Sequence, residues 1–293
     1  MGRARGLWSD AWRRLIRNRL AMFAMVVLIV FALVAFVGAH IGPTGRYAPN
    51  DQDYAAKQLA PSSGHWFGTD QLGRDMFARV LEGVRTSIEI GLGAQFVVLI
   101  IGLGVGASAA LGGRWSDNVL MRITDVTYAF PDLLAIILVR SALIGRHWGF
   151  ITDQKVMIIM AIALVNWTTI ARLARGQMLS LAERDYVLAA RALGATRGRV
   201  VFQHMLPNTL GPVIVALTFG IPFAIFAEAA LSFIGFGIPP PAASLGGLVS
   251  TGYSTIQRNV WNVVFPAGAV AVLMLSFTFL GDGLRDALDP RTR

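Results

Sequence analysis

Apolar stretches of about 20 residues recur along this chain, separated by polar segments rich in arginine, proline or glycine. A helix of that length rises about 30 Å, which is the thickness of the hydrocarbon core of a membrane. The 293 residues are 55% hydrophobic and only 15% charged, which is too apolar for an ordinary soluble domain. We therefore predict an all-α integral membrane protein with six transmembrane helices, at about 20–39, 87–111, 122–143, 156–170, 212–234 and 261–280.

The composition argues against several classes of function. There are no cysteines, and neither of the two lysines, Lys57 and Lys155, stands in a Walker A pattern. The four histidines are scattered without the i,i+4 spacing of a metal site, and no nucleophile motif is present. The net charge of +9 lies beside the apolar stretches rather than on a soluble domain, so it indicates topology rather than nucleic-acid binding. We expect no enzyme activity, cofactor or metal in this chain.

The distribution of charge predicts the orientation of the spans. Residues 1–19 hold six arginines and one acid, whereas 41–85 holds five acids and five bases. By the positive-inside rule the first segment is cytoplasmic and the second extracytoplasmic. A basic start before an apolar run also fits a signal peptide, but the run is long for one and further spans follow. Six spans then place both termini in the cytoplasm of a bacterial inner membrane.

The connecting segments carry local predictions. The sequence from 75 to 84 places apolar residues on one helical face, which favours a helix lying along the membrane surface. Residues 112–118 read as a short turn. Pro131 lies near the middle of the third span and predicts a kink.

Charged residues within spans are candidates for function, because an unpaired charge in lipid is costly. Asp132 beside the kink and its neighbour Phe130 are candidates for a translocation path, and Glu228 for a path or a gate. Arg140 is expected to snorkel to the outer edge. For Asp125 we expect a local pair with Arg122, one turn away.

The polar stretch 171–207 interrupts two spans and can dock a soluble partner. Residues 180–193 read as a helix that Gly194 ends, Thr196 can cap a second short helix, and Pro207 ends that one. Two alanines in this stretch are small enough for a groove of the partner to close around the backbone. Three arginines could form ion pairs with acids on that partner. On spacing alone, a solvated loop is equally consistent. The residues concerned are Ala189, Ala190, Arg191, Arg197 and Arg199.

This stretch resembles the EAA loop of ABC importer permeases, whose pattern is E-A-A, three residues, G, nine residues, then I-x-L-P. The chain offers Ala189, Ala190, Gly194, Leu206 and Pro207 at that spacing. It departs at the acid, where Leu188 stands, and at the isoleucine, where His204 stands.

Three further segments, 65–75, 228–246 and 280–291, resemble those of the C-type permease of dipeptide, oligopeptide and nickel importers. The resemblance implies a type I importer fold with three parts: residues 1–40 as the amino terminus and first span, 41–85 as an extracytoplasmic segment, and 86–293 as a five-helix core. The EAA loop, 171–211, would couple the core to an ATPase through Ala189, Ala190, Arg191, Gly194, Leu206 and Pro207.

The resemblance also implies partners. These are a B-type permease that shares the path, two ATPase subunits that hold ATP and Mg²⁺, and an extracytoplasmic peptide-binding protein. Two alternatives remain at this stage: a proton-coupled secondary transporter acting alone through a carboxylate such as Asp132, and an ABC permease for nickel or another small solute.

Overall fold

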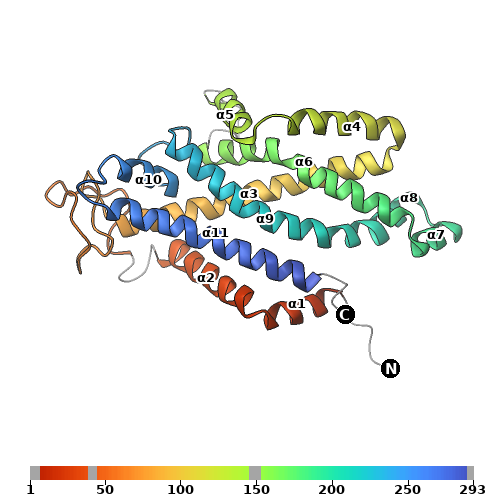
Figure 1. Cartoon of the computed structure of the whole chain (residues 1–293), viewed down its shortest axis with the longest axis horizontal. Helices are drawn as coiled ribbons and strands as arrows, with labels where there is room; N and C mark the ends of the chain where they lie inside the picture. Colours follow the sequence, from red (N-terminus) through yellow and green to blue (C-terminus); the bar gives the residue numbers. More distant parts are fainter. Residues whose placement is uncertain (1–6, 39–44, 145–152, 289–293) are drawn as a thin grey trace.

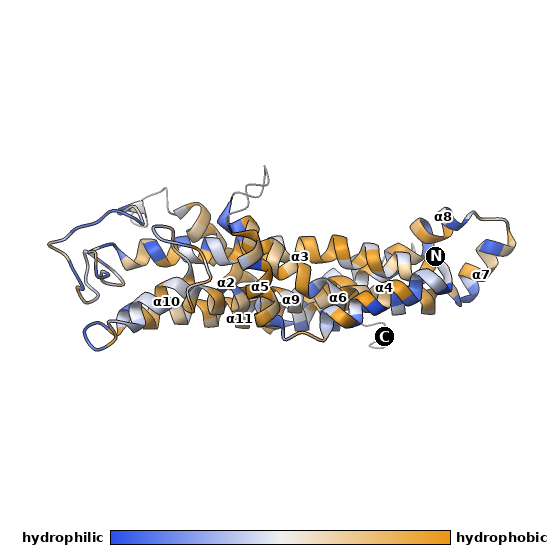
Figure 2. Cartoon of the chain, turned by 90° about the horizontal axis from the view of Figure 1, so that it is seen from above, coloured by the Kyte–Doolittle hydropathy of each residue, from blue (hydrophilic) through white to orange (hydrophobic). Residues whose placement is uncertain are grey.

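A computed structural model describes residues 7–38, 45–144 and 153–288 of the chain. The secondary structure of these residues is helical apart from one isolated bridge between Thr69 and Asp75. The helices form an elongated bundle (Figure 1). Apolar residues dominate its middle, and hydrophilic residues gather toward the two ends (Figure 2). The prediction of an all-α membrane protein is confirmed.

Five helices of the described residues are long and apolar enough to cross a membrane by themselves. A pair of helices bent by 97° at a short break passes the same test when counted as one span, which makes six, and we name this pair the bent span. The bend confirms the kink predicted at Pro131, which stands immediately before the second helix of the pair. The single spans are α2 (Arg19–Phe36), α3 (Met76–Leu111), α6 (Gln154–Ala182), α9 (Leu206–Phe233) and α11 (Trp261–Leu288), and the bent pair is α4 (Gly113–Tyr128) with α5 (Asp132–Leu143).

Glycines let α3 and α6 approach closely at the centre of the bundle. A Cβ atom added to Gly106 would lie 2.5 Å from the carbonyl oxygen of Ala171, and one added to Gly102 would lie 2.7 Å from Ile170. Such distances leave room only for hydrogen, so the backbones of the two helices are in contact. The helix pair gives α6 a fixed base from which the polar stretch after it projects.

The surface helix predicted at 75–84 is wrong. Asp75 caps α3 by accepting a hydrogen bond from the Ala78 amide at 2.9 Å, and the helix then continues unbroken to Leu111. The apolar face of its first turns packs inside the protein, where Met76 and Val80 join a cluster with α10 (Leu245–Tyr253) and α11. Protein rather than lipid covers this face.

The two ends of the bundle differ in what they carry (Figure 1). One end, which we name the α10 end, holds residues 45–75 and α10. The other, the α7 end, holds α1 (Leu7–Arg17), α7 (Asp185–Ala192) and the short α8 (Arg197–Val200). The turn predicted at 112–118 is shorter than expected, since α4 already begins at Gly113.

Candidate coupling site and translocation path

The polar stretch after α6 forms two short helices joined by a tight turn. Gly194 lies between them with a φ of +85°, a conformation that favours glycine, as the predicted helix end requires. Thr196 caps α8, since its hydroxyl oxygen accepts from the Arg199 amide at 3.4 Å, which confirms the predicted cap. The helix predicted at 180–193 is in fact two, because α6 runs on to Ala182 and α7 starts afresh at Asp185.

An apolar cluster fixes this loop to the bundle. Val187 from α7 and Val200 from α8 are fully or almost fully buried against Met178 of α6. Met205 is buried in the same cluster, and the predicted site residue Leu206 packs against it half-buried. Each buried aliphatic side chain stabilises the arrangement by about 1.5–3 kcal/mol. The loop is therefore part of the fold and not a free connection.

The outer surface of the loop presents the remaining residues of the predicted site. Ala189, Arg191 and Gly194 are exposed, and Ala190 is half-buried. Two large apolar side chains are also exposed to solvent on this loop, Leu193 at 88% and Phe202 at 71%. The motif gave no indication of either. Exposed apolar patches rimmed by polar residues mark sites that bind proteins or a membrane. A search for apolar residues flanking the glycine turn could have found Leu193.

Pro207 does not end a helix, contrary to prediction. A π-helical segment, η3 (Val201–Met205), follows α8 and leads directly into α9, in whose first turn Pro207 stands and is exposed. The loop is thus joined to α9 without a break.

The candidate path residues of the bent span lie at its corner. Phe130 is 57% exposed in the break between α4 and α5. Asp132 is the first residue of α5, and its side chain is also exposed. An aromatic ring and a carboxylate, separated by Pro131, are therefore both exposed at the bend, and their assignment to a translocation path stays a prediction.

Glu228 lies apart from that corner and is fully buried within α9. Its carboxylate accepts hydrogen bonds from the hydroxyls of Ser232, at 2.7 Å, and of Ser87 on α3, at 3.1 Å. These contacts join two spans inside the chain. The assignment of Glu228 to a path or a gate stays a prediction.

Arg140 does not snorkel to the membrane edge, as was predicted, but is buried at 2% exposure. Its guanidinium donates to the carbonyl oxygens of Phe236 at 2.5 Å and Gly237 at 2.7 Å, just after α9. It also donates to the side-chain oxygen of Gln154 at 3.0 Å, at the start of α6. The planar guanidinium suits several carbonyl acceptors at once. Arg140 therefore ties α5 to two other spans.

Ion pairs tie α4 to α6. Asp125 pairs with Arg172 at 2.9 Å and not with Arg122, so the predicted local pair is wrong. Arg172 also lies 4.3 Å above the ring of Tyr128, which holds it over α4. Near the start of α4, Asp117 forms a two-pronged ion pair with Arg175, one turn further along α6. The local prediction failed because it compared residues along one helix only.

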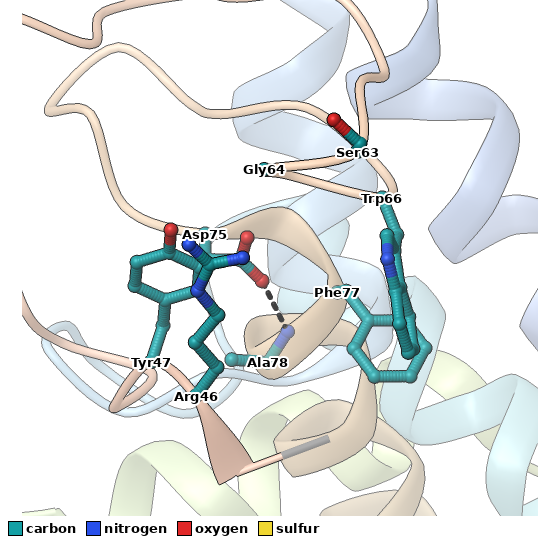
Figure 3. Close-up of a pocket in the computed structure, with 8 residues that line it drawn as sticks. All are labelled: Arg46, Tyr47, Ser63, Gly64, Trp66, Asp75, Phe77 and Ala78. Atoms are coloured by element: carbon teal, nitrogen blue, oxygen red, sulfur yellow. Dashed lines mark hydrogen bonds between the residues drawn. The ribbon is translucent and has the colours of Figure 1, made fainter. Parts of the chain in front are cut away.

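At the α10 end, residues 45–75 fold over the start of α3 around Asp75 (Figure 3). Besides capping α3, Asp75 binds the ring of His65 through Nδ1 at 2.8 Å. The His65 ring stacks on Tyr47 with centroids 4.7 Å apart, and Arg46 lies 5.3 Å from the centre of the Tyr47 ring. This network braces the extramembrane segment against a spanning helix.

Within the described ranges, no three His, Asp or Glu side chains come together as they would around a metal ion. The expectation that this chain holds no cofactor stays a prediction.

Comparisons with known proteins decide the family. Residues 100–293 match the model of the binding-protein-dependent transport system inner membrane component, and residues 6–61 match the N-terminal transmembrane domain of oligopeptide transport permease C. The chain belongs to the C-type permeases of ABC peptide importers. The predicted resemblance is thereby confirmed.

Relatives resemble this permease over nearly its whole length. The oligopeptide transport system permease protein OppC of Bacillus subtilis is 40% identical over 98% of this chain and 90% of its own length. The dipeptide transport system permease protein DppC of the same organism is 40% identical over 97% and 86%. OppC of Escherichia coli is 38% identical over 99% and 93%.

A solved structure shares the fold of the permease. An inward-facing structure of the MetNI methionine ABC transporter aligns with a TM-score of 0.58, at 20% identity, over 73% of this chain and 98% of that one. At this identity the likeness concerns the fold alone. It confirms the predicted type I importer architecture.

Proposed function

We propose that this permease is the C-type subunit of an ATP-driven importer of dipeptides or oligopeptides. It forms a translocation path with a B-type permease, receives substrate from an extracytoplasmic peptide-binding protein and performs no chemistry itself. Two ATPase subunits, which hold ATP and Mg²⁺, bind the α7 end from the cytoplasm. The proposal is supported by relatives named as oligopeptide and dipeptide permeases.

The observation that carries the coupling role is the built protrusion around Gly194. Its base is an apolar cluster inside the fold, while its outer surface exposes Arg191, Leu193 and Phe202. No acid within the described part of the chain forms an ion pair with Arg191. An exposed cation beside exposed apolar side chains matches what a protein partner buries at the centre of an interface.

The loop is also placed to transmit movement. Its α7 side continues from α6, and its α8 side continues through η3 into α9. Closure of two ATPases on ATP would shift two such loops together and so move two spans of each permease. ATP then supplies the differential binding energy that biases the permease pair between its inward-facing and outward-facing states.

The test is the Gly194→Trp variant in the complete importer. A Cβ at Gly194 would meet nothing within 4 Å, so the bulk points toward the partner and not into the chain. We expect normal membrane insertion but loss of ATPase co-purification and of peptide uptake. The matched control is Gly113→Trp, because Gly113 has a φ of +83° and equally open space.

Normal ATPase association of Gly194→Trp would contradict the docking role. Uptake by the purified permease alone, without ATP, would instead establish the secondary transporter. Substrate is then assigned by uptake of labelled dipeptides, oligopeptides and nickel with each candidate binding protein.

A further inference from the structure

A short helix, α1, precedes the first span and is built into the α7 end. One side of α1 packs against the end of α11, where Ala11 and Leu15 are buried at 6% and 5% exposure beside Ala287. At the same place a Cβ on Gly283 of α11 would lie 2.3 Å from the Cβ of Ala21 at the start of α2. Both helices therefore rest on α11, and their exposed sides turn away from it.

A second apolar face of α1 has no cover within the described chain. Trp12 is 54% exposed and Ile16, one turn later, 47%. The exposed apolar residues continue beyond the break at Asn18, with Leu20 at 52% and Phe23 at 66% in the first turns of the span α2. An apolar face that passes from a short helix into a spanning helix lies at the level where hydrocarbon begins.

Exposed arginines border this apolar face. Arg13 and Arg17 each follow an exposed apolar residue, and Arg19 opens α2. None of the three forms an ion pair with an acid in the part of the chain that the structure describes. Long arginine side chains let the charge reach the headgroup layer while the stem stays on apolar surface. The charge is complementary to anionic phospholipids and not to zwitterionic ones.

We propose that α1 is an interfacial anchor that binds anionic phospholipid headgroups through Arg13, Arg17 and Arg19 while Trp12 and Ile16 insert among acyl chains. The proposal needs membrane residence, which the family establishes, and does not rest on peptide transport. Because α1 packs on α11, bound lipid also holds the last turns of that span in place.

Depth measurements test the insertion. The chain has no cysteine, so single nitroxide labels can be placed directly at Trp12→Cys and Ile16→Cys in lipid nanodiscs containing phosphatidylglycerol. The matched control is Leu188→Cys, which is 49% exposed on α7 at the same end of the molecule. We expect the α1 labels to collide with oxygen and to be shielded from a water-soluble nickel chelate, and the α7 label to show the reverse.

Two outcomes of that measurement overturn the proposal. Labels on α1 as accessible to the nickel chelate as the control would place α1 in water. Labels shielded from both reagents would show that protein covers the face, either the partner permease or a second copy of this chain.

Charge removal tests the headgroup contacts. We would replace Arg13, Arg17 and Arg19 by Gln and count phosphatidylglycerol and phosphatidylcholine retained on the purified full chain by native mass spectrometry. Since each arginine contributes roughly a fivefold affinity for an anionic surface, the preference for phosphatidylglycerol should fall about a hundredfold. A control with Arg191, Arg197 and Arg199 replaced loses equal charge at the same end and should keep the preference. The proposal is overturned if the triple variant keeps its preference for phosphatidylglycerol. It is also overturned if the control variant loses that preference to the same extent.

Discussion

The α7–α8 loop and the α4 helix both contact α6, yet they are held to it in opposite ways. The loop is held by apolar side chains, with Val187 and Met178 fully buried. The α4 helix buries only Thr124, and ion pairs from Arg172 and Arg175 fasten it. Apolar packing is nearly indifferent to salt and is lost only by opening a cavity, whereas exposed ion pairs exchange partners readily. The loop should therefore move with α6, and α4 should be able to move relative to it.

The bend extends this contrast to α5. That helix buries only Ile136 and Arg140, and the arginine binds carbonyl oxygens rather than an acid. Polar contacts thus hold α4 to α6, while α5 combines its arginine contacts with the burial of Ile136 in an apolar cluster between α6 and α9. If the bent span lines the proposed translocation path, its α4 half is the part whose contacts can be broken and remade without opening a cavity.

The largest effect should follow from a charge in the apolar base of the loop. Val187→Asp buries a carboxylate at a fully buried position and should cost about 3 kcal/mol or more, detaching α7. Hydrogen exchange of the α7 amides should then accelerate at least about a hundredfold. Leu188→Asp, at the adjacent exposed position, should leave exchange unchanged. Equal exchange in the two variants would contradict the apolar anchor.

An intermediate effect should follow from loss of the guanidinium in α5. Arg140→Met leaves the carbonyl oxygens of Phe236 and Gly237 without a donor, at a cost of about 2–3 kcal/mol. A nitroxide at Leu138, which is 63% exposed, should become more mobile while labels on α7 do not. Arg140→Lys should restore only part of the order, because an ammonium does not span the same acceptors. Unchanged mobility in Arg140→Met would show that α5 is held by other contacts.

The smallest effect should follow from the ion pair at the start of α4. Asp117→Asn should cost about 1 kcal/mol or less, since both partners are partly exposed to water. High salt should reduce the difference, and the swap Asp117→Arg with Arg175→Asp should recover most of it. Thermal unfolding of the wild type, Asp117→Arg, Arg175→Asp and the double variant gives the coupling energy between the two residues. A coupling as large as the cost of Val187→Asp would remove the contrast between the two regions.

Local sequence signals predicted what depends on a few neighbouring residues. The kink at Pro131, the left-handed turn at Gly194 and the cap at Thr196 each follow from the conformational limits of one residue. The existence of the spans could be predicted from the length and apolarity of the segments, but the residues at which the helices begin and end could not. The proposed docking surface around Gly194 needed the family motif, because the exposure of its residues depends on the apolar cluster beneath them.

The contacts that the sequence did not reveal join distant segments. Arg140 and Phe236 are 96 residues apart, and nothing in the spacing of either indicates the other. Asp125 has a plausible partner in its own helix but pairs across to α6. The face that begins at Met76 looks like a membrane-surface helix until α10 is placed over it. In each case the deciding neighbour comes from a segment distant in the sequence.

The length of α3 has a mechanical consequence. Its 36 residues span about 54 Å, whereas a membrane core is about 30 Å thick, so roughly 20 Å stands outside the hydrocarbon even at an ordinary tilt. The network around Asp75 is built on that protruding end. No flexible joint separates the two, since the helix is continuous. A displacement of the extramembrane segment would therefore be passed to the middle of the bundle through one continuous helix.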